Sequence, residues 1–161
     1  MKDVIIIGGG PAGILCAAAI KENAKEMVNV TIVERLEKIG KKILATGNGK
    51  CNFTNKNLSP RRYNNPKFVT PTLSKYGYKE IVEYLESIGL LSKEISEGRM
   101  YPYTESATTV LEVMRMHLNR LGVNVKTNYE VNKVVEKNGR YLVYNKNQRN
   151  YYLECDYLVF A

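Results

Sequence analysis

The feature that most constrains this chain is a run of glycines between an apolar segment and an alanine-rich one. The run is Gly8-x-Gly10-x-x-Gly13, and it also holds Pro11 and Ala12. The β-branched segment Lys2–Ile7 before it is typical of a buried parallel strand, and the segment from Pro11 to about Lys25 predicts a helix. A second apolar segment, Asn29–Glu34, follows. The order strand, helix, strand predicts a βαβ unit with parallel strands.

In this context the glycine spacing predicts a dinucleotide-binding turn. Gly8 would allow the tight turn, Gly10 would let the backbone approach a pyrophosphate, and Gly13 would let helix and strand pack closely. The phosphates would lie at the positive end of the helix. Glu34 ends the second strand and could accept hydrogen bonds from both ribose hydroxyls. Because a carboxylate there disfavours a 2′-phosphate, FAD or NAD is expected rather than NADP. The alternative is a merely structural turn beside a solvated glutamate.

The rest of the chain predicts further elements of an α/β fold. Amphipathic patterns predict helices over Tyr78–Ile88 and Ser106–Leu121, followed by a strand at Gly122–Val125. Three short segments, Glu130–Val135, Arg140–Asn145 and Tyr151–Glu154, indicate an antiparallel meander, and Asp156–Ala161 has the pattern of a buried strand. The proline-containing stretch Asn55–Lys75 is expected to be a loop. Since the chain stops on a core strand, we expect residues 1–161 to be part of one larger domain.

Charge and composition exclude several classes of protein. The net charge of +8 is carried by the stretch Arg35–Lys67, while the remainder is neutral. No apolar run is long enough to cross a bilayer or to act as a secretory signal, so a cytoplasmic protein is expected. Three separated cysteines and a single histidine argue against a metal site, a disulfide framework or a Ser-His or Cys-His hydrolase.

A second segment that could bind a ligand is the glycine-rich, amide-rich and basic run Gly40–Asn55. After a short helical stretch containing Lys42, it presents donors suited to a phosphate or to the carbonyl edge of a flavin. The candidate residues are Thr46, Gly47, Asn48, Gly49, Cys51 and Asn52. A polar surface loop is the alternative. The basic surroundings of Cys51 would lower the pKa of its thiol, but without a partner cysteine nearby a packing role is favoured.

The sequence resembles the BaiN/YhiN-like flavoproteins, which include aminoacetone oxidase-like enzymes. The resemblance extends over essentially the whole chain. It rests on the glycine turn, Glu34, the run Gly40–Asn55, the segment Gly98–Pro102 with the helix after it, and Asp156–Ala161. In this family the second run usually reads GGGRCNxTN, so Asn48 and Lys50 depart from the pattern, and Lys50 keeps the charge.

The resemblance implies a truncated Rossmann-like FAD-binding domain of the glutathione-reductase type, with a parallel sheet and a β-meander crossover. It places FAD along Gly8–Gly13, the ribose on Glu34 with Arg35 nearby, and the flavin end near Lys42 and Thr46–Asn52. It further implies that the backbone of Val131 meets the adenine, and that Ala161 ends the strand beside the cofactor. The substrate domain and a last FAD-contacting segment would be absent from these 161 residues, so the isolated chain is expected to bind FAD weakly and to lack turnover.

The function this implies is hydride transfer from an unidentified small substrate to the flavin, whose reduced form passes electrons to oxygen or another acceptor. The basic run would suit an anionic substrate, and an uncharged one stays open. Three alternatives stay open. The basic stretch could hold a nucleic-acid backbone, the chain could be a non-catalytic fragment, or it could be an NAD-linked dehydrogenase. The last requires alternating strands and helices after Glu34, which the sequence does not show. Substrate, electron acceptor and oligomeric state have no signature in this sequence.

Overall fold

The computed structural model describes residues 1–148 and 150–161, and it divides the chain into two compact units. The first unit consists of Met1–Lys42 and Met114–Ala161, and the second of Ile43–Val113. Two helices, α2 (Lys41–Leu44) and α5 (Ala107–Arg120), contain the points where the chain passes from one unit to the other. Each unit is described by itself.

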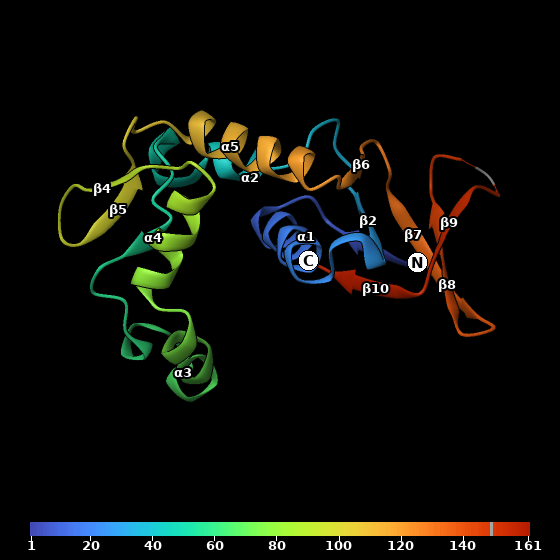
Figure 1. The fold of residues 1–161 in the computed structure, drawn as a ribbon, viewed down its shortest axis with the longest axis horizontal. Helices are drawn as coiled ribbons and strands as arrows, with labels where there is room; N and C mark the ends of the chain where they lie inside the picture. Colours follow the sequence, from blue (N-terminus) through green and yellow to red (C-terminus); the bar gives the residue numbers. More distant parts are fainter. Residues whose placement is uncertain (149) are drawn as a thin grey trace. The chain divides into compact units, whose positions relative to one another are not determined.

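The first unit is built on a four-stranded parallel sheet in the order β10-β1-β2-β6 (Figure 1). The strands are β1 (Lys2–Ile7), β2 (Val28–Val33), β6 (Asn124–Lys126) and β10 (Tyr157–Phe160). Ile7 lies in register with Val33 on one side and with Phe160 on the other. Because the three strands end level with one another, Gly8, Glu34 and Ala161 leave the sheet at the same edge.

The two faces of this sheet are covered by different elements. Helix α1 (Pro11–Ala24), followed by the 3-10 turn η1 (Lys25–Met27), connects β1 to β2 and packs against both strands. The opposite face meets an antiparallel meander of β7 (Val131–Lys137), β8 (Arg140–Asn145) and β9 (Tyr152–Cys155). There Ile5 and Val33 form a buried cluster with Tyr129, Val143 and Cys155. Side chains alternate along a strand, so β1 and β2 serve both layers of the core.

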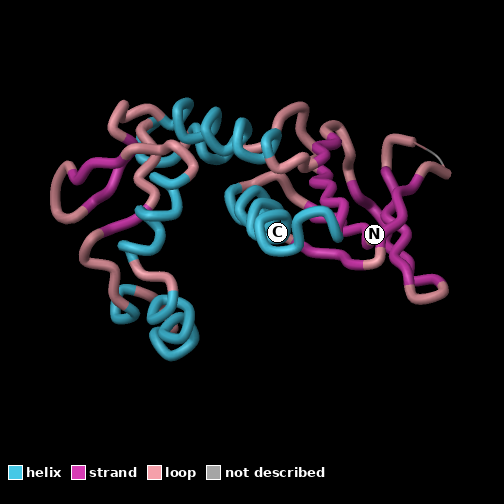
Figure 2. Tube along the Cα trace, viewed as in Figure 1, coloured by secondary structure: helices cyan, strands magenta, loops and turns pink. Residues whose placement is uncertain are grey.

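The second unit is largely helical, with one short antiparallel sheet in the order β3-β5-β4 (Figure 2). Its strands are β3 (Thr54–Asn55), β4 (Ser92–Glu94) and β5 (Arg99–Pro102). Its helices are α3 (Pro66–Lys75) and α4 (Tyr78–Ser87), with 3-10 turns η2 (Thr46–Gly49) and η3 (Pro60–Arg62). Among the described residues, no helix is both long and apolar enough to cross a membrane.

The structure confirms the predicted parallel sheet, the first crossover helix, the meander, and the helices α4 and α5. The prediction of a loop over Asn55–Lys75 is wrong for its second half, which forms α3. Prolines misled the prediction, since Pro66 occupies the first turn, where its missing N–H costs nothing. The Asn65 side chain caps the helix by accepting a hydrogen bond from the Phe68 amide at 3.2 Å. The sheet β3-β5-β4 was not predicted, because its strands are too short to show alternation.

Candidate functional site

The first unit contains a cavity of about 480 Å³ at the edge where β1, β2 and β10 end. This is the position at which open parallel sheets commonly bind ligands. The cavity is lined by Ile7, Gly8, Gly9, Gly10, Pro11, Ala12, Val33, Glu34, Arg35, Leu36, Lys38, Gly40, Lys41, Lys42, Tyr129, Glu130, Val131 and Ala161. Of the predicted site residues in this unit, all but Gly13 lie on its wall.

Two of the predicted glycines are required by contacts within the chain itself. Gly8 has a φ of +112°, and a Cβ there would lie 2.2 Å from the Ala161 carbonyl oxygen. A Cβ on Gly13 would lie 2.0 Å from the Gly8 carbonyl oxygen. Both obstacles are backbone atoms, which cannot rotate away. Gly13 therefore lies beneath the turn, where it lets α1 pack closely on β1 as the sequence predicts.

Gly10 differs from these two glycines, because nothing in the chain requires a glycine there. Its backbone is extended, with φ −78° and ψ −178°, a conformation open to any residue. No heavy atom of the described residues lies within 4 Å of the position its Cβ would take. Gly10 precedes α1, whose first turn carries no acid and, within the described chain, no side-chain cap. The bare glycine thus leaves open space in front of an uncapped helix N-terminus, an arrangement suited to a phosphate group.

Gly9 is a site residue that the sequence reasoning missed. A Cβ there would lie 2.5 Å from Ile39 Cγ2, its amide donates to Glu34 Oε2 at 2.8 Å, and its carbonyl accepts from the Gly40 amide at 2.7 Å. Gly9 therefore joins the glycine turn to the two segments that form the opposite wall. Three consecutive glycines were the signal that could have found it, since the motif itself needs only the first and third.

Glu34 is held in place by backbone groups on both of its carboxylate oxygens. Oε2 accepts from Gly9, and Oε1 accepts from the Leu36 amide at 2.9 Å. The segment is also fixed from behind, where Tyr129 N donates to the Glu34 carbonyl at 2.9 Å. Each carboxylate oxygen can accept a further hydrogen bond. The carboxylate is thus oriented and still able to receive two hydroxyl groups.

The charged residues around the cavity are not all free to meet a ligand. Lys41 pairs with Glu37 at 3.0 Å, and Glu130 pairs with Lys146 at 2.8 Å. The other cations on the wall are Arg35, Lys38 and Lys42. With Glu130 already paired to a lysine, these cations leave the wall positively charged except at Glu34, which matches a ligand that carries phosphates beside a ribose.

The remaining predicted site residues, Thr46, Gly47, Asn48, Gly49, Cys51 and Asn52, belong to the second unit, where they form a compact loop. Gly47 and Asn48 both have a φ of 54°, and the Cys51 amide closes the loop onto the Thr46 carbonyl at 3.0 Å. The Asn52 side chain donates to the Met100 carbonyl at 2.9 Å, which ties the loop to β5. Lys50 is engaged by Glu105 at 2.7 Å. The approach of this loop to a flavin stays a prediction.

Cys51 has the environment of a packing residue. Its side chain is buried, and burial raises the pKa of its thiol despite a hydrogen bond with Thr46. Burial likewise raises the pKa of the Cys155 thiol. The expected lowering of the Cys51 pKa by basic neighbours is therefore wrong, because removal from water is the largest influence on this thiol and the influence that opposes it is the hydrogen bond with Thr46.

Thiol labelling of the native protein is expected to show one accessible cysteine. Cys16 is only half-buried, so a thiol-reactive disulfide reagent at neutral pH should modify it first, while Cys51 and Cys155 react at least about tenfold more slowly. In denaturant all three should react alike. The Cys16→Ser variant supplies the control, since it should lose the fast phase alone. A fast phase that persists in this variant would show that Cys51 or Cys155 is reactive.

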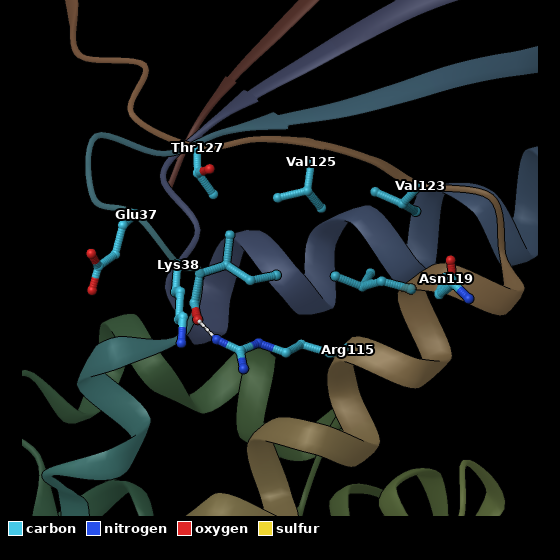
Figure 3. A pocket seen from close by; sticks show the side chains of 9 residues that line it. Glu37, Lys38, Arg115, Asn119, Val123, Val125 and Thr127 are labelled. Atoms are coloured by element: carbon cyan, nitrogen blue, oxygen red, sulfur yellow. Dashed lines mark hydrogen bonds between the residues drawn. The ribbon is translucent and has the colours of Figure 1, made fainter.

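A second cavity of about 460 Å³ lies in the same unit, beside α5 and β6 (Figure 3). Its walls combine apolar side chains from Leu118, Val123 and Val125 with the guanidinium of Arg115. Arg115 donates to the Ile39 carbonyl oxygen at 2.8 Å, the contact drawn as a dashed line in Figure 3. Ile39 is the residue that packs against Gly9, so this arginine holds the segment that closes the first cavity.

Comparison with known proteins places the chain among Rossmann domains. The HI0933-like protein Rossmann domain family matches residues 2–161. The 3-dehydro-bile acid delta(4,6)-reductase of Clostridium scindens is 41% identical over 133 residues, which are 81% of this chain and 32% of that protein. The ribosomal RNA dihydrouridine synthase of Haemophilus influenzae is 33% identical over 135 residues, or 83% of this chain and 33% of that protein. The chain thus spans about a third of the length of these curated relatives.

Among solved structures, the open conformation of a flavocytochrome c3 fumarate reductase superposes with a TM-score of 0.68. The match covers 99% of this chain and 33% of that one, at 19% sequence identity. At that identity the likeness shows the fold. It confirms the predicted Rossmann-like architecture, with its parallel sheet and antiparallel crossover.

Proposed function

Because the chain belongs to the HI0933-like protein Rossmann domain family, we propose that it forms the FAD-binding part of a flavoprotein oxidoreductase. The observation that carries the proposal is Gly10. A glycine that neither the backbone conformation nor any neighbour demands is explained by a ligand that passes close to it. The position fits the pyrophosphate of a dinucleotide, since α1 begins at the next residue.

The other walls of the cavity fit the adenosine half of FAD. Glu34, with both oxygens oriented by backbone amides, would accept the ribose hydroxyls. Val131, at the start of β7, would face the adenine, while Arg35 and Lys42 would balance the phosphate charge. Ala161 lies against Gly8 and closes the cavity from the β10 side. A volume of about 480 Å³ suits part of a dinucleotide, with the flavin end extending beyond it.

FAD, when bound, would supply the capacity to accept or donate a hydride. The chain's own contribution would be binding and orientation. The loop Thr46–Asn52 carries the donors proposed to meet the flavin, and Lys42 would supply a positive charge near it. The names of the two relatives point to different substrates, a bile acid derivative and ribosomal RNA. We extend to this chain the reductase chemistry and a small, acidic substrate, as the name of the bile acid relative indicates.

The test compares two glycines in the same structural position. Gly10→Ala should weaken FAD binding at least about tenfold, because a methyl group would occupy the proposed pyrophosphate site. Gly77→Ala is the matched control. Gly77 also precedes a helix, in the same extended conformation (φ −80°, ψ −170°), and its Cβ would meet only the flexible end of Glu80 and, at 3.6 Å, the Leu73 carbonyl. Each variant should have an almost unchanged Tm.

Flavin fluorescence during titration with FAD gives the affinity. Equal affinities of the two variants would show that Gly10 does not border the ligand. A competition series identifies the part of FAD that is held. ADP should displace FAD, whereas FMN, which lacks the adenosine half, should not. Displacement by FMN alone, or tight binding of NAD without FAD, would overturn the assignment.

A further inference from the structure

An exposed basic segment of the second unit is not used by the proposed flavin site. Between Ser59 and Tyr76 the chain has four cations and no acidic residue. The cations are Arg61, Arg62, Lys67 and Lys75, and all four side chains are exposed. In the part of the chain that the structure describes, the ion pairs formed by lysine and arginine involve other residues. Their charge is therefore available to a partner.

Aromatic rings lie among these cations. Phe68 is 79% exposed, and Tyr63 and Tyr76 are 41% and 52% exposed. Phe68 is the most exposed large apolar side chain in the described structure, so it gains nothing from the protein's own core. Lys75 lies over the ring of Tyr76, with its Nζ 5.1 Å from the ring centroid. Exposed cations and exposed rings thus alternate along this segment of the chain.

Helix α3 fixes the directions in which Lys67, Phe68 and Lys75 leave the backbone. Its apolar residues Val69 and Leu73 are half-buried, and residues four apart lie on the same side of a helix, so these two face the protein. Lys67, Phe68 and Lys75 lie on the opposite, exposed half of the helix, where Phe68 and Lys75, seven residues apart, are nearly aligned. The turn η3, which carries both arginines, packs against α3. Figure 1 shows α3 at the end of the second unit, beyond α4.

We propose that this face, formed by η3 and α3, binds single-stranded nucleic acid. Lysine and arginine would contact the phosphates, and Phe68 with the two tyrosines would stack on unpaired bases. The four cations are exposed and can reach phosphate groups, and the three rings are exposed and can stack on bases. A membrane surface would require a wide apolar stripe, but the apolar side of α3 faces inward. The proposal is independent of FAD.

The experiment measures fluorescence anisotropy of labelled unstructured RNA and DNA strands, at several salt concentrations. Phe68→Ala should weaken binding about tenfold and leave the salt dependence unchanged, because stacking releases no counterions. The double variant Arg61→Gln/Arg62→Gln should reduce the slope of log affinity against log salt by about 2, one per lost phosphate contact. A duplex of the same sequence should bind more weakly than either strand.

Two variants in the first unit serve as controls. Phe160→Ala removes a ring that is 72% exposed, and Arg120→Gln/Lys137→Gln removes two exposed cations. Neither should change the affinity or its salt slope beyond about twofold. A preference for RNA or for DNA identifies which strand is the partner. Equal losses in test and control variants, or binding to anionic vesicles without binding to either strand, would overturn the proposal. FAD titrations of Phe68→Ala should match the unaltered chain, so failure here leaves the flavin proposal standing.

Discussion

Replacing Gly13 by alanine is expected to lower the free energy of unfolding by about 3 kcal/mol, or the Tm by roughly 6–12 °C. Two effects oppose each other at this position. Alanine is a better helix former than glycine by about 1 kcal/mol, which alone would stabilise α1. Against this, the new Cβ would lie 2.0 Å from the Gly8 carbonyl oxygen and 3.4 Å from Ile6 Cγ2. Relief requires α1 to move off the buried strand β1, and this cost exceeds the gain in helix propensity.

Thermal unfolding followed by circular dichroism measures the effect. Gly10→Ala, three residues earlier in the same turn, is the control, because its Cβ would meet no heavy atom of the described residues within 4 Å. It should shift the Tm by no more than a few degrees. A Tm of Gly13→Ala equal to or above that of the unaltered chain would mean that α1 does not pack on β1 as closely as the structure shows.

Replacing Glu34 by glutamine is expected to weaken FAD binding on the order of 10- to 100-fold. Both carboxylate oxygens of Glu34 accept backbone N–H groups, from Gly9 and from Leu36. A glutamine has one acceptor oxygen, so its amide NH₂ would face one of these donors. An unsatisfied donor costs about 1–3 kcal/mol, and a hydrogen bond to a charged acceptor contributes about 1.5–3 kcal/mol. The variant therefore loses both the charged acceptor for the ribose and the orientation of the segment.

Glu130→Gln controls for the change in charge. Glu130 also lines the cavity, but its carboxylate pairs with Lys146, so its affinity for FAD should stay within about twofold. Competition with ADP and with 2′-phospho-ADP provides a second readout. The unaltered chain should discriminate strongly against the 2′-phosphate because of the carboxylate, and Glu34→Gln should lose most of that discrimination. Retained discrimination in this variant would show that Glu34 does not face the ribose.

The parts of the fold that the sequence predicted are those with strong local signals. The buried strand β1, the alanine-rich helix α1 and the meander each combine a regular pattern with clear turn residues. The short sheet of the second unit and helix α3 were missed. Strands of two to four residues show no periodicity, and Pro71 inside α3 made the segment resemble a loop. Prolines mark turns only on average, and tertiary contacts decide whether a particular proline-containing segment forms a helix.

For the candidate site, the motif predicted which residues line the cavity but not how they are held. Gly8, Glu34 and Ala161 lie where a parallel sheet would place them. The run of three glycines could have pointed to Gly9, but its contacts could not be predicted, since they depend on Ile39 and Gly40 from another segment. The burial of Cys51 likewise depends on contacts distant in sequence, so its basic neighbours suggested the opposite pKa shift.

The pairing of β10 with β1 joins residues 157–160 to residues 4–7. The cavity wall at Gly8 is completed by the carbonyl of Ala161, so the pocket cannot close before residue 161 has been synthesised. A contact of such long range is slow to form in folding. It also means that a ligand bound in the pocket would fasten β10 to β1, and would favour the folded state in proportion to its affinity. During synthesis, this wall of the pocket can form only after β10 has emerged.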